Sequence, residues 1–299
     1  MAVPSNPTVT SIVTQALRHA GLPSPLTAQV TELATEGLQT VKTELWASQE
    51  RDALLETTVM VLLPIGNGQL DTPADFDHAV TLDVYTSDES MAFTASTAAS
   101  TTLTAPSTFS ADVSTVRGRY IFTTSGTGSG QYRQITAYND TTKVLTVTPA
   151  WTTTPDATTV VFIGQQRRRL ELDDPGTGWA RWSTNGEALS SGYPSRYRLV
   201  GSSPLNTDIP AIEINPVPDT ARYAMLMKYG ANLTRLDEVG TIFVKHLRER
   251  RGLWMQGLSV QAMSRYDETR YPQAYAVWQA MLHQYQGHNP TYDRMEPQR

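Results

Sequence analysis

Threonine is concentrated in one block of this sequence, and that block limits what the chain can fold into. Of the 41 threonines in 299 residues, 20 lie between Thr94 and Thr159. A β-branched side chain packs well on a pleated strand while its hydroxyl meets water, so this composition favours solvated β-strands. The sequence on either side of the block has helical periodicity. The chain therefore combines two kinds of structure.

Within the block, four short runs are predicted to be strands. They cover residues 119–123, 131–137, 144–148 and 159–163 and are separated by turns rich in Gly, Asn, Asp or Pro. Residues 138–143 are expected to form a hairpin loop. Short strands at such regular spacing are typical of a small antiparallel sandwich or barrel. We predict that residues 86–164 form an inserted, threonine-rich antiparallel β-module.

The flanking sequence predicts helices at both ends and strands between them. Apolar residues recur at helical spacing in residues 9–20 and 26–45, and Gly21 and Pro23 separate these two helices. Further helices are expected at residues 241–264 and 271–287, and strands at 59–63, 80–85, 167–172, 197–200, 211–214 and 223–229. The predicted fold class is α+β. Residues 1–85 and 165–299 would form one discontinuous helical body with a β segment, and residues 288–299 a C-terminal tail.

Composition excludes several classes of function. A chain without cysteine has no disulfides, no thiolate zinc site, no iron–sulfur cluster and no cysteine nucleophile. A net charge of −5 argues against a general nucleic-acid binder. The longest apolar run, residues 59–65, is far shorter than the roughly 20 residues of a membrane helix, and the first residues do not resemble a secretory signal. We expect a soluble protein that is made in a cytoplasm and has no membrane partner.

Charge is distributed unevenly along the chain. Residues 1–85 contain 3 Lys and Arg against 10 Asp and Glu, a balance of −7. Residues 86–164 are near −1, which leaves about +3 for the remainder. An acidic front and a basic back would suit the packing of identical subunits against one another. Ordinary solvated surfaces would explain the same distribution.

The sequence offers little for catalysis or for ligand chemistry. None of the five histidines stands in a metal-binding spacing, and His246 and His283 are expected to be polar surface or interface groups. Carboxylates occur in pairs, such as Glu32 with Glu36 and residues 171–174, but no pattern suggests an apolar pocket around them. We predict no catalytic residue, no cofactor site and no metal site, and therefore no enzymatic activity.

The C-terminal part is rich in residues that are typical of protein interfaces. The basic run 245–251 is expected to face acidic neighbours, with Arg248, Arg250, Arg251 and Trp254 in contact between subunits. Tryptophan and tyrosine, interleaved with arginine, continue to the end of the chain at Trp254, Tyr266, Tyr271, Tyr275, Trp278, Tyr285 and Tyr292. This combination matches the composition of binding hot spots.

Four segments carry a resemblance to a known family. They are the N-terminal helical hairpin with residues 70–77 (LDTPADFD), then residues 192–199 (GYPSRYRL), residues 212–219 (IEINPVPD), and the strand 223–229 followed by aromatic helices. This layout resembles the head-to-tail adaptor proteins of short-tailed bacteriophages. The likeness covers residues 1–85 and about 165–299, and the motifs are short. The insert is similar to small β-modules of phage tail proteins.

The resemblance implies a structural virion protein at the head–tail interface, made in the bacterial host cytoplasm. It implies a ring of twelve copies between the portal protein and the tail nozzle, through which genomic DNA passes without specific binding. Carried onto this chain, the portal contact falls on Tyr275, Trp278, Tyr285, Tyr292 and Arg294. The inserted module would decorate the ring and touch the nozzle, fibres or spikes. An acidic lumen would repel DNA phosphates and let the genome slide.

Two other functions remain open at this point. The first is a receptor- or glycan-binding tail component, which would need Tyr132, Tyr138 and Trp151 on one exposed face of the β-module. The second is a peptidoglycan hydrolase that uses two carboxylates, since such a pair can be far apart in sequence.

Overall fold

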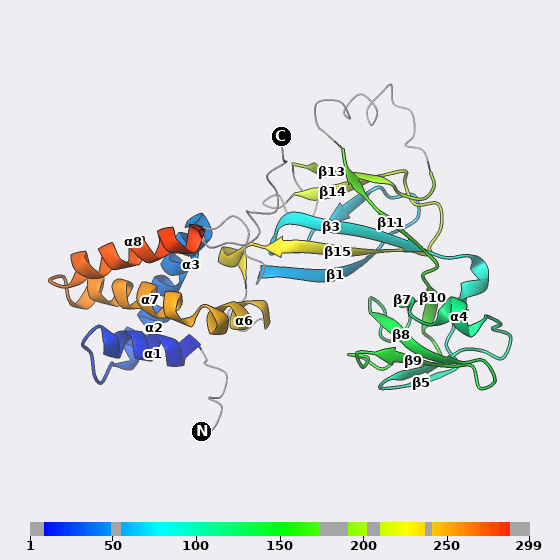
Figure 1. Ribbon diagram of the computed structural model, residues 1–299, viewed down its shortest axis with the longest axis horizontal. Coiled ribbons are helices and arrows are strands. Elements are labelled where there is room, and N and C mark those ends of the chain that lie inside the picture. Colours follow the sequence, from blue (N-terminus) through cyan, green and yellow to red (C-terminus); the bar gives the residue numbers. More distant parts are fainter. Residues whose placement is uncertain (1–8, 49–54, 174–190, 202–209, 237–240, 288–299) are drawn as a thin grey trace. The chain divides into compact units, whose positions relative to one another are not determined.

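A computed structural model of the chain shows an α+β protein with several antiparallel sheets (Figure 1). The structure describes residues 9–48, 55–173, 191–201, 210–236 and 241–287. Its contacts divide the chain into two units, which we treat separately. The helical unit comprises Met1–Thr57, Ala74–His78 and Tyr229–Arg299, and the β unit comprises Thr58–Pro73 and Ala79–Lys228. The predicted division into residues 86–164 and the rest of the chain stays a prediction.

The N-terminal helices of the helical unit follow the apolar periodicity of the sequence. Helix α1 spans Val9–His19, and Gly21 then turns the chain with a φ of +96°. The second helical stretch consists of α2 (Thr27–Glu32), a π-turn (Leu33–Gly37) and α3 (Leu38–Ser48) without interruption. Buried Ile12, Val13, Ala16 and Leu17 form the inner face of α1. The expected hairpin is present in this form.

Three C-terminal helices complete the helical unit. Helix α6 spans Thr241–Glu249, α7 spans Arg251–Tyr266 and α8 spans Tyr271–Gly287. The single helix expected at residues 241–264 is therefore two, because Arg250 leaves the helical conformation at φ −107° and ψ 27°. Helix α7 contacts α1, α3 and α8. Gly257 makes this close approach possible, since a Cβ there would lie 2.9 Å from Val41 Cγ1 and 3.1 Å from the Trp278 ring.

Two four-stranded sheets belong wholly or largely to the β unit. The first, sheet A, has the order β1-β15-β3-β11, with β1 at Glu56–Leu62, β15 at Tyr223–Ala231, β3 at Phe76–Thr86 and β11 at Gln166–Arg169. The second, sheet B, has the order β12-β13-β14-β2, with Glu171–Leu172, Arg196–Val200, Ala211–Asn215 and Gln69–Asp71. Tyr193 links them: its ring stacks on Tyr223 at 5.5 Å and its hydroxyl donates to Val84 O at 2.9 Å.

The third sheet contains seven strands and closes into a barrel. Its order is β4-β10-β7-β8-β9-β6-β5, and these strands span Ala92–Thr94, Val160–Ile163, Tyr120–Ser125, Tyr132–Asn139, Val144–Thr148, Thr102–Thr104 and Thr97–Ala99. The two edge strands, β4 and β5, are separated by only Ala95 and Ser96. Ala95 N donates to Thr159 O on one side and Ser96 N to Thr104 O on the other. One bent segment therefore joins both edges of the sheet.

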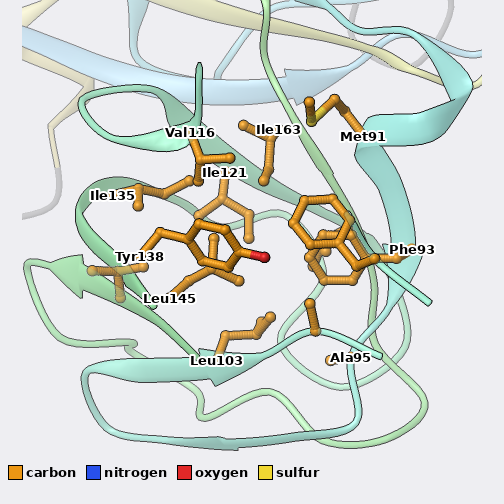
Figure 2. Packing of buried hydrophobic residues seen from close by; sticks show 14 of the residues in the cluster. Met91, Phe93, Ala95, Leu103, Val116, Ile121, Ile135, Tyr138, Leu145 and Ile163 are labelled. Atoms are coloured by element: carbon orange, nitrogen blue, oxygen red, sulfur yellow. The ribbon is translucent and has the colours of Figure 1, made fainter. Parts of the chain in front are cut away.

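Apolar side chains fill the interior of this barrel. Ile121, Ile135, Leu145 and Val161 are fully buried there, and Figure 2 shows the side chains of the cluster pointing toward a common centre. Many threonines lie on the outside, as their composition suggested, but Thr123 is buried and donates its hydroxyl to Gly128 O at 2.7 Å. The short helix α4 (Val113–Val116) and the 3₁₀ turns Glu89–Met91 and Leu233–Arg235 complete the described elements.

The strands that sequence patterns predicted are present, and others were missed. Strand β9 has the predicted bounds, and β7, β8 and β10 differ from prediction by one or two residues at each end. Strands β4, β5 and β6 were not predicted. Each has only three residues, which is too short for an alternating pattern to be recognised.

The turns of the barrel provide a stability test. Gly118 and Gly126 have similar φ angles of +83° and +77°, so alanine at either position meets the same left-handed backbone cost of roughly 1–2 kcal/mol. A Cβ at Gly126 would also lie 2.2 Å from Thr158 O, whereas a Cβ at Gly118 has no heavy atom within 4 Å. We expect Gly126→Ala to lower the free energy of unfolding by about 1–3 kcal/mol more than Gly118→Ala. Urea denaturation measures both, and equal midpoints would contradict the described turn.

Candidate protein-interaction surface

Helix α8 has an unusual composition. Its 17 residues include no Asp, Glu, Lys or Arg, in a chain that is 18% charged. The exposed positions Gln273, Ala276, Val277, Ala280, His283 and Gln284 gather on one side of the helix, because residues three, four and seven apart share a face. Val277 alone is 52% exposed. Interface cores are depleted of charge in the same way, so this face is a candidate contact surface.

The opposite side of α8 is held in the helical unit by Trp278. Its side chain is fully buried against Gly257, and its Nε1 donates to Glu44 Oε2 of α3 at 2.6 Å. A fully buried side chain offers no surface to a second protein. We therefore withdraw Trp278 from the residues predicted to contact a portal, since its aromatic ring serves packing.

The other predicted portal contacts have different standings. Tyr275 is 38% exposed, and its ring lies 5.6 Å from that of Tyr271, so it is accessible at the edge of the α8 face. Tyr285 belongs to α8, but its side chain lies outside the described residues, as do Tyr292 and Arg294. These assignments stay predictions.

The predicted inter-subunit residues divide into surface and core. Arg248 is exposed beside Glu249, and exposed Arg251 donates to Gln15 of α1 at 2.7 Å. Arg250 is half-buried where α6 meets α7. Trp254, in contrast, is fully buried, so it is also withdrawn.

The buried partner of Trp254 corrects a second expectation. Trp254 Nε1 donates to Nδ1 of His246 at 3.1 Å, and His246 is only 1% exposed. Since Nδ1 accepts this bond, a neutral His246 has its proton on Nε2. His246 is a core residue and not the surface group that its sequence context suggested. His283 is exposed, as expected.

The turn between α7 and α8 fixes where α8 begins. Asp267 accepts hydrogen bonds from the Thr269 hydroxyl and the Arg270 guanidinium, which hold the pKa of this carboxyl at about 2. Arg270 also donates to Ala20 O at 2.6 Å, at the end of α1. The start of α8 is thereby tied to the N-terminal helices, and its exposed face has a defined direction within the helical unit.

The carboxylates that sequence analysis singled out are engaged in ion pairs. Glu32 accepts from the Tyr266 hydroxyl at 2.6 Å and from Arg265 at 2.7 Å, and the pKa of Glu32 is lowered mainly by the Tyr266 bond. Arg265 also lies 3.2 Å from Glu36. A general acid needs the opposite shift. Among the residues that the structure describes, no group of three or more acidic or histidine side chains could hold a metal ion.

The aromatic platform expected on the β-module is not formed. Tyr138 and Trp151 are each 6% exposed and belong to the core of the barrel, whereas Tyr132 is half-buried on its outside. The three rings therefore do not share an exposed face, because β8 alternates between the inside and the outside of the barrel.

Comparisons with known proteins leave the family open. No protein-family model matches the chain, and no curated protein matches its sequence. None of the described helices is long and apolar enough to cross a membrane. The neutral face of α8 was missed at the sequence level, although seventeen consecutive residues without charge were a visible signal for it.

The two sides of α8 can be distinguished by mutation. Trp278→Ala removes a fully buried indole and should lower the free energy of unfolding by about 3–5 kcal/mol. Val277→Ala, one residue away on the exposed side, should change it by no more than about 0.5 kcal/mol. Thermal denaturation of both variants checks the orientation of the helix, and similar losses would show that it is wrong.

The turn before α8 should make stability depend on pH. The pKa of Asp267 is about 2 in the folded protein, below its ordinary value of 3.8. Its contribution is therefore fully present above about pH 4 and is lost as the pH falls from 4 to 2. We expect Asp267→Asn to lower the melting temperature at pH 6 but to converge with the parent protein at pH 2. Glu268→Gln, at the exposed neighbour, is the control, and a pH-independent difference for Asp267→Asn would contradict the assignment.

Proposed function

We propose that this protein is a structural virion protein, the head-to-tail adaptor of a short-tailed bacteriophage. In this role it forms a ring between portal and tail nozzle, completes the head and gates DNA passage. The observation that carries the proposal is the neutral, exposed face of α8, on the helix where the family resemblance places the portal contact. Burial of such a face desolvates no charged side chain, which favours docking against another protein.

The helical unit supplies further support for an assembly role. Exposed Arg248 and Arg251 present positive charge near the start of α7, and Glu36 presents a carboxylate whose side chain is 71% exposed. In a ring of identical copies, unlike charges on two different faces attract neighbouring subunits in a head-to-side arrangement. These groups would guide the orientation of subunits more than they would add affinity.

Ring formation would multiply a modest contact. Once one subunit is docked on a portal, its neighbours are held at high effective concentration, so a small α8 face on each of twelve copies suffices. The partners in this proposal are the portal, the nozzle, and tail fibres or spikes near the β-module. DNA passes through the lumen without specific binding, and no membrane takes part.

Docking on a portal tests the proposal directly. We expect the purified protein to be monomeric and to form a ring only when mixed with the portal ring of the same phage, as seen by cryo-electron microscopy. Val277→Asp places a charge in the centre of the α8 face and should reduce the bound fraction at least tenfold, because that charge would be desolvated on docking.

Ile65→Asp is the matched control. Ile65 is 60% exposed but belongs to the β unit, so its charge should leave portal docking unchanged. If the parent protein ignores the portal, the adaptor proposal is wrong. If both variants dock normally, the protein can still be an adaptor but α8 is not its contact surface.

A further inference from the structure

One face of sheet A changes from apolar to polar along its strands. Side chains two residues apart on a strand share a face, so each strand supplies a short series to this side. The series are Leu62, Met60 and Thr58 on β1, Ala224, Leu226 and Lys228 on β15, and Tyr85, Asp83 and Thr81 on β3. The apolar members pack against the outside of the barrel. The polar members continue beyond this contact and line a cleft.

The cleft has a volume of about 280 Å³. Besides the sheet residues, Tyr120 of β7 and Tyr132 of β8 line it from the barrel, and Arg167 lines it from β11. Its volume is close to the lower end of the range for small-molecule sites, roughly 300–1,000 Å³. It has room for one group of the size of a single sugar ring and not for a nucleotide or a folded peptide.

The charges in the cleft favour an anionic ligand. Asp83 is 8% exposed, and Arg167 Nη2 lies 2.7 Å from its Oδ2 while Arg169 Nε lies 3.3 Å from its Oδ1. The carboxylate is therefore already compensated. Among the lining residues, Arg167 and Lys228 outnumber Asp83 and leave a net charge of +1. A second cation would be repelled, whereas the planar fork of an arginine suits a carboxylate.

The tyrosines give the cleft a second chemical character. The Tyr120 ring lies edge-to-face to Tyr85 at 5.6 Å and to Tyr132 at 5.8 Å. Burial raises the pKa of Tyr85 and of Tyr132, so both phenols remain protonated at neutral pH and can donate hydrogen bonds. Aromatic walls with hydroxyl groups match a ligand that has both C–H faces and hydroxyls. A bare inorganic anion would leave these walls unused.

We propose that this cleft binds one acidic sugar, a hexuronate-type unit of a polysaccharide. Its carboxylate would lie at Arg167 and Lys228, its ring against Tyr120 and Tyr132, and its hydroxyls near Asp83 and the two threonines of the cleft. The site goes beyond the adaptor role and does not rest on it. Sugar binding and portal docking use different surfaces and fail independently.

A ligand-observed NMR titration of the full chain tests this site. The probes are galacturonate, galactose as the neutral sugar, and inorganic phosphate as the anion without a sugar ring. We expect a Kd of about 1 mM for galacturonate, typical of a ligand of this size, and at least tenfold weaker binding of the other two. Arg167→Gln and Lys228→Gln should each weaken galacturonate binding at least tenfold.

Controls separate a lost contact from a lost fold. Arg117→Gln removes an exposed arginine of the barrel that does not line the cleft, and it should bind galacturonate as the parent does. Tyr132→Phe keeps the ring packing and should weaken binding a few-fold without lowering the melting temperature. No binding at about 20 mM galacturonate, equal binding of galactose or phosphate, or normal binding by both cation variants would each overturn the proposal.

Discussion

The β unit depends on the contact between two outward-facing phenylalanines of the barrel and one face of sheet A. Phe122 stacks on Phe162 at 5.0 Å, and the Tyr85 ring lies 5.2 Å from Phe122. On the same strands, Ile121 and Val161 point into the barrel. Alternation along β7 and β10 therefore divides their apolar side chains between two cores, one inside the barrel and one outside it. Without sheet A, the outer aromatic side chains would be exposed to water.

This contact also explains why a cleft exists beside it. The barrel covers the apolar part of the sheet face, and the face then turns polar where cover ends, at Thr58, Asp83 and Lys228. In the helical unit, α8 shows a related division between anchoring and exposure. Its tryptophan and the turn at Asp267 hold it in place, and its neutral side remains open to solvent. Both proposed contact sites are therefore the uncovered continuations of packed surfaces.

Sequence patterns predicted long, strongly periodic elements well. Helix α8 has its predicted bounds, because Pro272 stands in its first turn and Gly287 ends it. Aromatic spacing was less informative: Trp254 and Trp278 fit a helical stripe, but a stripe that packs inside a bundle looks the same as one that meets a partner. The cleft could not be predicted either. Its residues come from positions as distant as Thr58 and Lys228, which only the pairing of strands brings together.

The sequence by itself determined the α+β class, the threonine-rich strands between helical ends, and the absence of cysteine chemistry. These follow from composition and from periodicities that act over a few residues. Only the tertiary structure decided that the seven-stranded sheet closes through Ala95 and Ser96, that His246 and both tryptophans are core residues, and that Asp83 meets Arg167. The physical reason is that burial and closure depend on partners far away in the chain, about which a local pattern carries no information.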